Sequence, residues 1–271
     1  MSRYKLRANY DIENIDSQKM DGTVIVDVPM LSNGELNYGL SHIKKKLYEE
    51  NVYPSEIGFD IMSLATMVYM ADTRIERVVH GQDSWTREIE LEIPVSNVEI
   101  WDSQIRTVER MLKFLTGDLW KITLSSRAWQ FNNLEEVREK SNKYDEVSLF
   151  SGGMDSLIST INLMENKKNT LLISHAGEGL TKNAQKNIVN KFDLLYPDVL
   201  HTWLDLWMVF PRDYIPAGGN DNNTRSRSFL FIGYALFAMT GMDNINELLV
   251  PENGLIALNV PLDETRVGSF S

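Results

Sequence analysis

The segment Glu146–Ser156 reads EVSLFSGGMDS and is the most informative part of this chain of 271 residues. Val147–Phe150 is a short apolar run of the kind that forms a buried parallel strand. Leu157, Ile161 and Met164 then recur at helical spacing. The sequence therefore predicts a strand and a helix joined by a turn that contains two adjacent glycines.

The turn Ser151–Ser156 has the chemistry of an anion site. Adjacent glycines let the backbone approach a ligand closely, and the start of a helix supplies free N–H groups and a positive dipole end. Ser151 and Ser156 add hydroxyl donors, whereas Asp155 is unfavourable beside a phosphate unless it orients the loop or holds Mg²⁺. We interpret the turn as a phosphate-binding loop. The alternative is a glycine turn capped by Asp155 and Ser156, without a nucleotide.

Three common motifs do not account for this turn. The chain contains no GxxxxGK[ST] loop, the GxGxxG spacing of dinucleotide-binding folds is absent, and the segment is not the GxSxG of a nucleophile elbow. If the turn binds a nucleotide, it belongs to another class of phosphate loop.

The rest of the second half alternates strands and helices, which predicts a parallel sheet with helices on both faces. Ligands of such sheets bind at the carboxyl ends of the strands. The expected strands include Thr170–Ser174 and Asn246–Val250, and the expected helices are Thr181–Leu195 and Arg227–Thr240. The predicted strand ends that form the ligand edge are Ser151–Ser156, His175–Gly179 and Pro251–Asn253.

The pattern SGGxDS resembles the loop of the PP-loop ATP pyrophosphatases. Within that group, residues 100–271 resemble the QueC family, the 7-cyano-7-deazaguanine synthases, in which a segment PARNxxF follows the loop. Thr224–Phe231 is its counterpart here and keeps the arginine as Arg227. A looser counterpart of a second family loop is Pro251–Asn259. The stretches FLTGDLW, ENGLIALNVPL and RVGSFS are closer still to the QatC group of bacterial anti-phage defence proteins.

The resemblance implies a PP-loop fold, a doubly wound parallel sheet over residues 141–271, and the cofactors ATP and Mg²⁺. It implies an enzyme that splits ATP into AMP and pyrophosphate, and so activates a carboxylate or amide for attack by a nitrogen nucleophile. Asp155 and Arg227 would be catalytic, with Asp155 also on the metal. The nucleotide would lie on Ser151, Gly152, Gly153, Asp155, Ser156, His175, Arg225 and Arg227, and the acceptor on Glu252 and Asn253.

Simpler readings remain open at the outlying positions. The simpler interpretation of His175 is a structural histidine, that of Arg227 is half of a surface salt bridge, and that of Glu252 and Asn253 is an ordinary turn. Other readings of the whole chain are an NAD-synthetase-like or tRNA-lysidine-synthetase-like ligase, or a nucleotide-binding scaffold in a defence complex.

The absence of cysteine separates the chain from the synthases that it resembles. QueC enzymes carry a C-terminal cysteine cluster for zinc, and a chain with no cysteine has no cysteine-ligated zinc, disulfide or thiol nucleophile. We therefore expect a truncated or divergent C-terminal end, and the source of nitrogen to be solvent or a partner.

Residues 1–140 are expected to form a smaller α+β domain of unassigned chemistry. Strands are predicted at Tyr4–Asn9, Thr23–Val28, Thr86–Pro94 and Leu119–Ser125. A buried helix is predicted over 55–74 with Ser55 as its cap, and another from Asp102 or Ser103 to about Leu115, ended by Gly117. The charged run within 132–145 is expected to mark the boundary.

Charge and hydropathy limit the partners. With 27 Lys and Arg against 38 Asp and Glu, the net charge of −11 disfavours non-specific nucleic-acid binding. The longest apolar run, Phe229–Met239, is about half of the roughly 20 residues that a membrane span needs, and the N-terminus lacks the apolar core of a signal peptide. We expect a cytoplasmic protein without membrane contact, whose partners are an acceptor substrate and other proteins of a defence operon.

Overall fold

The computed structural model describes residues 3–132, 143–221, 223 and 225–252. Within these residues, the first half contains a five-stranded sheet in the order β2-β3-β1-β6-β7, in which only β2 runs antiparallel to its neighbour. Its strands are β1 (Arg3–Asn9), β2 (Asp16–Met20), β3 (Thr23–Pro29), β6 (Glu88–Val95) and β7 (Leu119–Ser126). A separate hairpin joins β4 (Leu31–Ser32) to β5 (Glu35–Leu36).

Strand β6 shows why the alternating pattern was informative. Ile89, Leu91 and Ile93 are buried, while the glutamates between them stay partly exposed. Glu88 and Glu92 pair with Arg3 and Lys5 of the neighbouring strand β1. The acidic face that the sequence places outward is therefore stabilised by cross-strand ion pairs.

Helix α2 (Glu56–Arg74) is the central helix of the first half, and its prediction is confirmed. The Ser55 side chain caps it by accepting a hydrogen bond from the Gly58 amide at 3.1 Å. Most of the helix is buried on all sides, as the methionines among its apolar positions indicated. The other helices of this half are α1 (Leu40–Glu49), α3 (Arg77–His80), α4 (Val98–Asp102) and α5 (Ile105–Thr116).

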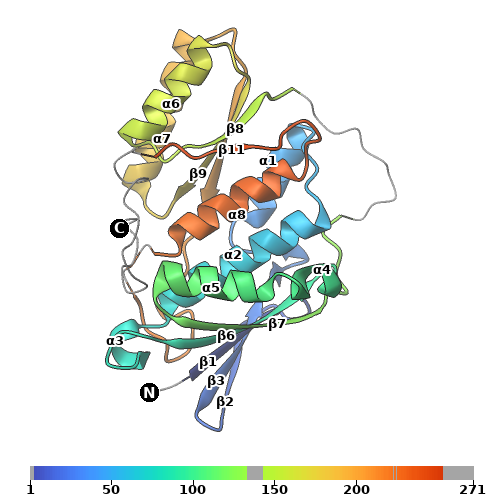
Figure 1. The fold of residues 1–271 in the computed structure, drawn as a ribbon, viewed down its shortest axis with the longest axis vertical. Coiled ribbons are helices and arrows are strands. Elements are labelled where there is room, and N and C mark those ends of the chain that lie inside the picture. Colours follow the sequence, from blue (N-terminus) through green and yellow to red (C-terminus); the bar gives the residue numbers. More distant parts are fainter. Residues whose placement is uncertain (1–2, 133–142, 222, 224, 253–271) are drawn as a thin grey trace.

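The second half contains a parallel sheet in the order β10-β9-β8-β11, so the predicted α/β class with mostly parallel strands is confirmed. Helices α6 and α7 cover one of its faces and α8 packs on the other (Figure 1). Its strands are β8 (Glu146–Leu149), β9 (Thr170–Ala176), β10 (His201–Trp207) and β11 (Leu248–Leu249). Its helices are α6 (Met154–Glu165), α7 (Gly179–Leu195) and α8 (Arg227–Met239).

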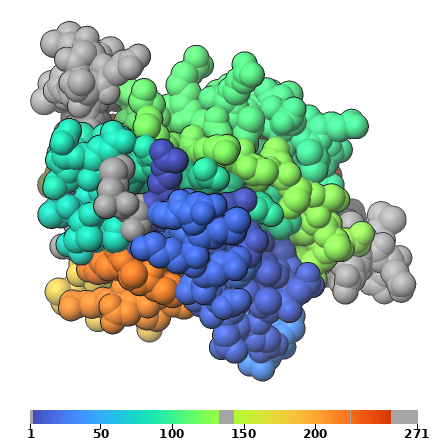
Figure 2. Space-filling model, turned by 90° about the horizontal axis from the view of Figure 1, so that it is seen from below, coloured from blue at the N-terminus to red at the C-terminus, as the bar shows by residue number. Residues whose placement is uncertain are grey.

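The two halves meet where α2 lies against α8, between the two sheets (Figure 1). Small residues allow the close crossing: a Cβ on Gly233 would come within 2.8 Å of the Ala65 side chain. One contiguous apolar core includes residues of both sheets and both helices. Loop residues of the second half also reach the first, because Tyr4 donates to the Ala217 carbonyl, and Figure 2 shows the orange segment against the teal one on that side.

One expectation about the elements was wrong. No helix begins at Asp102 or Ser103, because α4 ends there and α5 begins at Ile105, after Gln104. Asn97 caps α4 by accepting from the Ile100 amide. Gly117 does end α5 in the left-handed conformation, as expected, with φ of 76°. The expected boundary run and the stretches ENGLIALNVPL and RVGSFS lie largely or wholly outside the described residues.

Candidate functional site

The loop Ser151–Ser156 lies at the point where the second sheet changes direction. The chain leaves β8 toward β9 and β10, with α6 and α7 on one face, and returns by α8 on the other face to place β11 on the far side of β8. The carboxyl ends of β8 and β11 therefore lie at a topological switch point, which is the usual ligand site of doubly wound sheets. The loop follows β8, and Glu252 follows β11, at this edge.

The two glycines of the loop have different backbone conformations. Gly152 has φ of +83°, and a Cβ there would also approach Gln185 Cγ to 2.9 Å. Gly153 is extended, at φ −82° and ψ 173°, and is the residue from which α6 begins. Gly152 thus makes the turn, and Gly153 opens the helix N-terminus, whose first amides have no partner inside the helix.

The serine hydroxyls hold the loop in shape. Buried Ser156 accepts from the Gly152 amide at 3.1 Å and donates to the Gly153 carbonyl at 2.9 Å. Ser151 Oγ lies 3.1 Å from Ser156 Oγ and accepts from the Gly153 amide at 3.2 Å. These hydrogen bonds fix the shape of the loop, and a loop fixed in shape loses less conformational entropy when it binds a ligand.

Gln185 of α7 joins the loop to the next strand, and the sequence reasoning missed it. Its Nε2 donates to the Ser151 carbonyl at 3.0 Å and to the His175 carbonyl at 3.4 Å. The side chain is buried, and its Oε1 has no hydrogen-bond partner among the described residues. The sequence signal that could have identified Gln185 is its position as a polar residue on the buried face of an amphipathic helix.

Asp155 follows β8 and Glu252 follows β11 at this edge of the sheet. Both side chains are exposed. Desolvation and the nearby charge of Asp155 raise the pKa of Glu252, which places the two acidic groups within electrostatic reach of each other. Asn253, the other residue expected at this position, lies outside the described residues.

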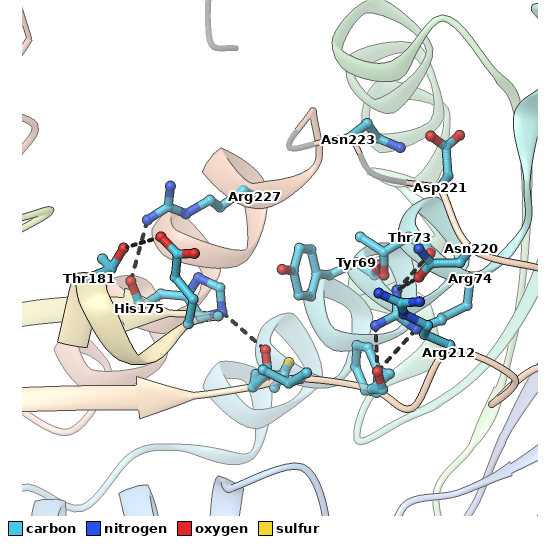
Figure 3. Close-up of a pocket in the computed structure, with 15 residues that line it drawn as sticks. Tyr69, Thr73, Arg74, His175, Thr181, Arg212, Asn220, Asp221, Asn223 and Arg227 are labelled. Carbon is cyan, nitrogen blue, oxygen red and sulfur yellow. Dashed lines mark hydrogen bonds between the residues drawn. The ribbon is translucent and has the colours of Figure 1, made fainter.

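A cavity of about 540 Å³ opens beside this edge, between the carboxyl ends of β9 and β10 and the C-terminal end of α2. It contains two of the sequence-predicted site residues, His175 and Arg227, and none of Ser151–Ser156. Figure 3 shows Arg227 and His175 on one side and Arg74, Arg212 and Asn220 on the other, with Tyr69 projecting between them. The cavity is walled by both halves of the chain.

His175 is buried at the end of β9. Its Nε2 lies 3.3 Å from the Met208 carbonyl, and its ring meets that of Tyr69 edge-on at 5.4 Å between centroids. Burial and the charge of Arg227 lower its pKa from 6.5 to about 4, so the ring is neutral at pH 7. Its Nδ1 is buried and has no partner among the described residues.

The two predicted arginines point to different places. Arg227 is the first residue of α8 and its guanidinium donates to the His175 carbonyl at 3.4 Å. Arg225 instead donates to the Thr116 carbonyl at 2.9 Å and lies over the Trp85 ring, 4.9 Å from its centroid. Arg227 thus faces the cavity, while Arg225 is engaged with the first half.

A buried ion network fixes the start of α8, and the sequence did not predict it. Asp72 of α2 accepts from the Ser226 amide at 3.1 Å, immediately before Arg227. Asp72 and Asp118 also bind the fully buried Arg87, at 2.5 and 2.6 Å. The position of Arg227 therefore depends on residues of the first half.

Comparisons of the chain with protein-family models, with curated proteins and with solved structures gave no match. Within residues 3–132, 143–221, 223 and 225–252, no cluster of three or more His, Asp or Glu side chains is arranged to hold a metal ion. No helix in that part of the chain is long and apolar enough to cross a membrane.

Proposed function

We propose that this chain is an ATP pyrophosphatase of the PP-loop type, which binds ATP and Mg²⁺ at Ser151–Ser156 and activates an acceptor. An acceptor carboxylate or amide oxygen attacks the α-phosphorus, pyrophosphate leaves, and a nitrogen nucleophile then displaces AMP. The observation that carries the proposal is a glycine turn at a helix N-terminus, located at the switch point of a parallel sheet.

The loop fits the phosphates of a nucleotide. Gly152 keeps the backbone in a left-handed turn that few other residues adopt. The first amides of α6, the positive end of its dipole and the exposed Ser151 hydroxyl lie at the loop. These groups would stabilise the negative charge that grows on the leaving pyrophosphate.

The two carboxylates fit a magnesium ion bound with phosphate. Mg²⁺ in nucleotide sites commonly takes one or two protein carboxylates, and phosphate oxygens and water complete its coordination. Asp155 would be the ligand, and its charge is, after desolvation, the second cause that raises the pKa of Glu252. A bound cation would also relieve the repulsion between these two groups.

Arg227 would bind the nucleotide or acceptor from the cavity side. Its guanidinium has no carboxylate within ion-pair distance among the described residues, so it is available to an anion. Arg225 would not take this role while it contacts Trp85 and Thr116. We extend the proposal to a role in anti-phage defence on the sequence resemblance alone.

The proposal is tested by measuring pyrophosphate release from ATP with a panel of small carboxylates and ammonium. We expect the wild-type chain to release pyrophosphate. Asp155→Ala should do so at least about 100-fold more slowly, because the loss of one group that stabilises charge in a transition state commonly has an effect of this size. Asp198→Ala, an exposed acidic residue of the turn after α7, is the matched control and should keep the wild-type rate. Release that is absent from the wild-type chain, or equal in Asp155→Ala, would contradict the enzymatic proposal.

A further inference from the structure

The cavity beside the loop is not explained by nucleotide binding alone. Part of its wall comes from the first half of the chain, namely Tyr69, Thr73 and Arg74 at the end of α2. The opposite wall is His175 and Arg227 (Figure 3). Its volume of about 540 Å³ lies within the range of small-molecule pockets, roughly 300–1,000 Å³.

The lining of the cavity carries more basic than acidic side chains. Arg74, Arg212 and Arg227 line it, and within the described residues none has a carboxylate at ion-pair distance. Arg74 is held in place by backbone carbonyls and by Asn220 Oδ1 at 2.9 Å.

Two acids also line the cavity, and neither is paired with these arginines. Glu178 accepts from the Thr181 hydroxyl at 3.0 Å. Asp221 lies 3.5 Å from the buried guanidinium of Arg87 and 3.8 Å from that of Arg77. Even when both acids are counted, the three arginines leave the lining of the cavity with an excess of positive charge.

His175 adds a hydrogen-bond acceptor to a cavity whose arginines are donors. A carbonyl only accepts, so the contact with Met208 requires a proton on Nε2. In the neutral ring, Nδ1 is then a lone-pair acceptor, and it is buried without a donor among the residues that the structure describes. A ligand N–H or O–H would satisfy this acceptor, which those residues leave unpaired.

From these observations we propose that the cavity is the acceptor site. It takes a small anion whose charged group meets the arginines and whose N–H or O–H donates to His175 Nδ1. The first half, through the end of α2, then selects the acceptor. That the bound anion is the acceptor of the reaction rests on the proposed function. The chemical class of the ligand rests on the cavity itself.

The test measures equilibrium binding of the 2-, 3- and 4-aminobenzoates, which combine a carboxylate with an amine at different spacings. Benzoate lacks the donor, and methyl 4-aminobenzoate lacks the charge. We expect at least one aminobenzoate to bind about tenfold more tightly than benzoate, and about tenfold more tightly than the methyl ester. A factor of this size corresponds to one hydrogen bond to a charged or buried group. Arg212→Gln, at an exposed cavity arginine, should weaken that binding by a similar factor. Arg106→Gln, an exposed arginine of α5, is the matched control.

The outcomes separate this inference from the proposed function. Binding of the aminobenzoate together with Mg²⁺–ATP supports an acceptor site, and mutual exclusion overturns it, because the cavity would then belong to the nucleotide. Equal affinity for aminobenzoates and benzoate, or no effect of Arg212→Gln, overturns the ligand class. A chain that binds no ATP contradicts the proposed function, yet the aminobenzoate comparison still decides what the cavity binds.

Discussion

Gly152 and Gly153 are adjacent, but different physical requirements place glycine at each position. Gly152 needs glycine for its φ of +83° and for its contact with Gln185. Gly153 has an ordinary φ, and a Cβ there would meet only Ser151 Oγ, at 3.4 Å. A side chain at Gly153 would instead occupy the space in front of the helix N-terminus. The first glycine shapes the loop, and the second leaves room for a ligand.

At His175 the structure predicts a pH dependence of stability. In the unfolded chain the ring takes up a proton near its ordinary pKa of 6.5, whereas in the folded chain it does so only near 4. The contribution of the neutral His175 ring to stability is therefore fully present above pH 6.5, the pKa in the unfolded chain. It is lost as the pH falls toward about 4, the pKa in the folded chain. We expect the free energy of unfolding to fall by about 2 kcal/mol between about pH 7 and about pH 5.

Urea unfolding of the wild-type chain and of His175→Gln at both pH values checks this. The amide side chain of Gln does not titrate, so the variant should lose less stability on acidification by about the same 2 kcal/mol. If both proteins lose stability equally, His175 does not titrate with a lowered pKa.

Among the elements, the network around Arg87 joins α2, α3 and the start of β7. Arg77 and Arg87 both bind Asp118, at 2.8 and 2.6 Å, and all three side chains are buried. Asp118→Asn would leave two buried guanidinium groups without a full counter-charge. We expect it to lower the free energy of unfolding by about 3–5 kcal/mol, measured by urea titration.

The matched control for that network is the exposed pair Arg3–Glu88. Arg3 is 65% exposed, so Glu88→Gln should cost less than about 1 kcal/mol. A cost for Asp118→Asn as small as that of Glu88→Gln would mean that the network does not hold these elements together.

The elements that the sequence missed have specific physical reasons. Strand β2 has no buried residue, so it carries no alternation to detect. Strand β10 contains the buried Asp205, which breaks its apolar run; Lys46 of α1 and Lys182 of α7 neutralise it from distant parts of the chain. Helix α1 buries Leu40, Ile43 and Leu47, a pattern that was readable but lies among lysines.

For the whole molecule, the sequence predicted the loop and the edge of the second sheet better than their surroundings. Local patterns indicated the strand before Ser151, the helix after it and the strand that ends near Glu252. The wall that α2 contributes to the cavity depends on the packing of α2 against α8, which no local pattern encodes. The same holds for the contact between Asp72 and Ser226, which are far apart in the sequence.

One contiguous core connects the two halves, so the expected domains 1–140 and 141–271 share their interior at α2 and α8. The residues proposed to carry the chemistry and the residues that position them come from different halves of the chain. The second half carries the loop and most of the cavity lining, and the first half holds the start of α8 and adds the end of α2 to the cavity. We infer that the second half would not reproduce the site on its own.

The central claim, that Ser151–Ser156 binds the phosphates of ATP, is tested most directly by calorimetric titration of the whole chain with Mg²⁺–ATP. We predict saturable binding that Gly152→Ala weakens by at least about tenfold, the equivalent of one charge-assisted hydrogen bond. Gly34→Ala is the matched control: Gly34 has a similar φ of +77° with open space around it, in the β4–β5 hairpin, and the variant should bind as the wild type does. No binding by the wild-type chain, or equal binding by Gly152→Ala, would contradict the claim.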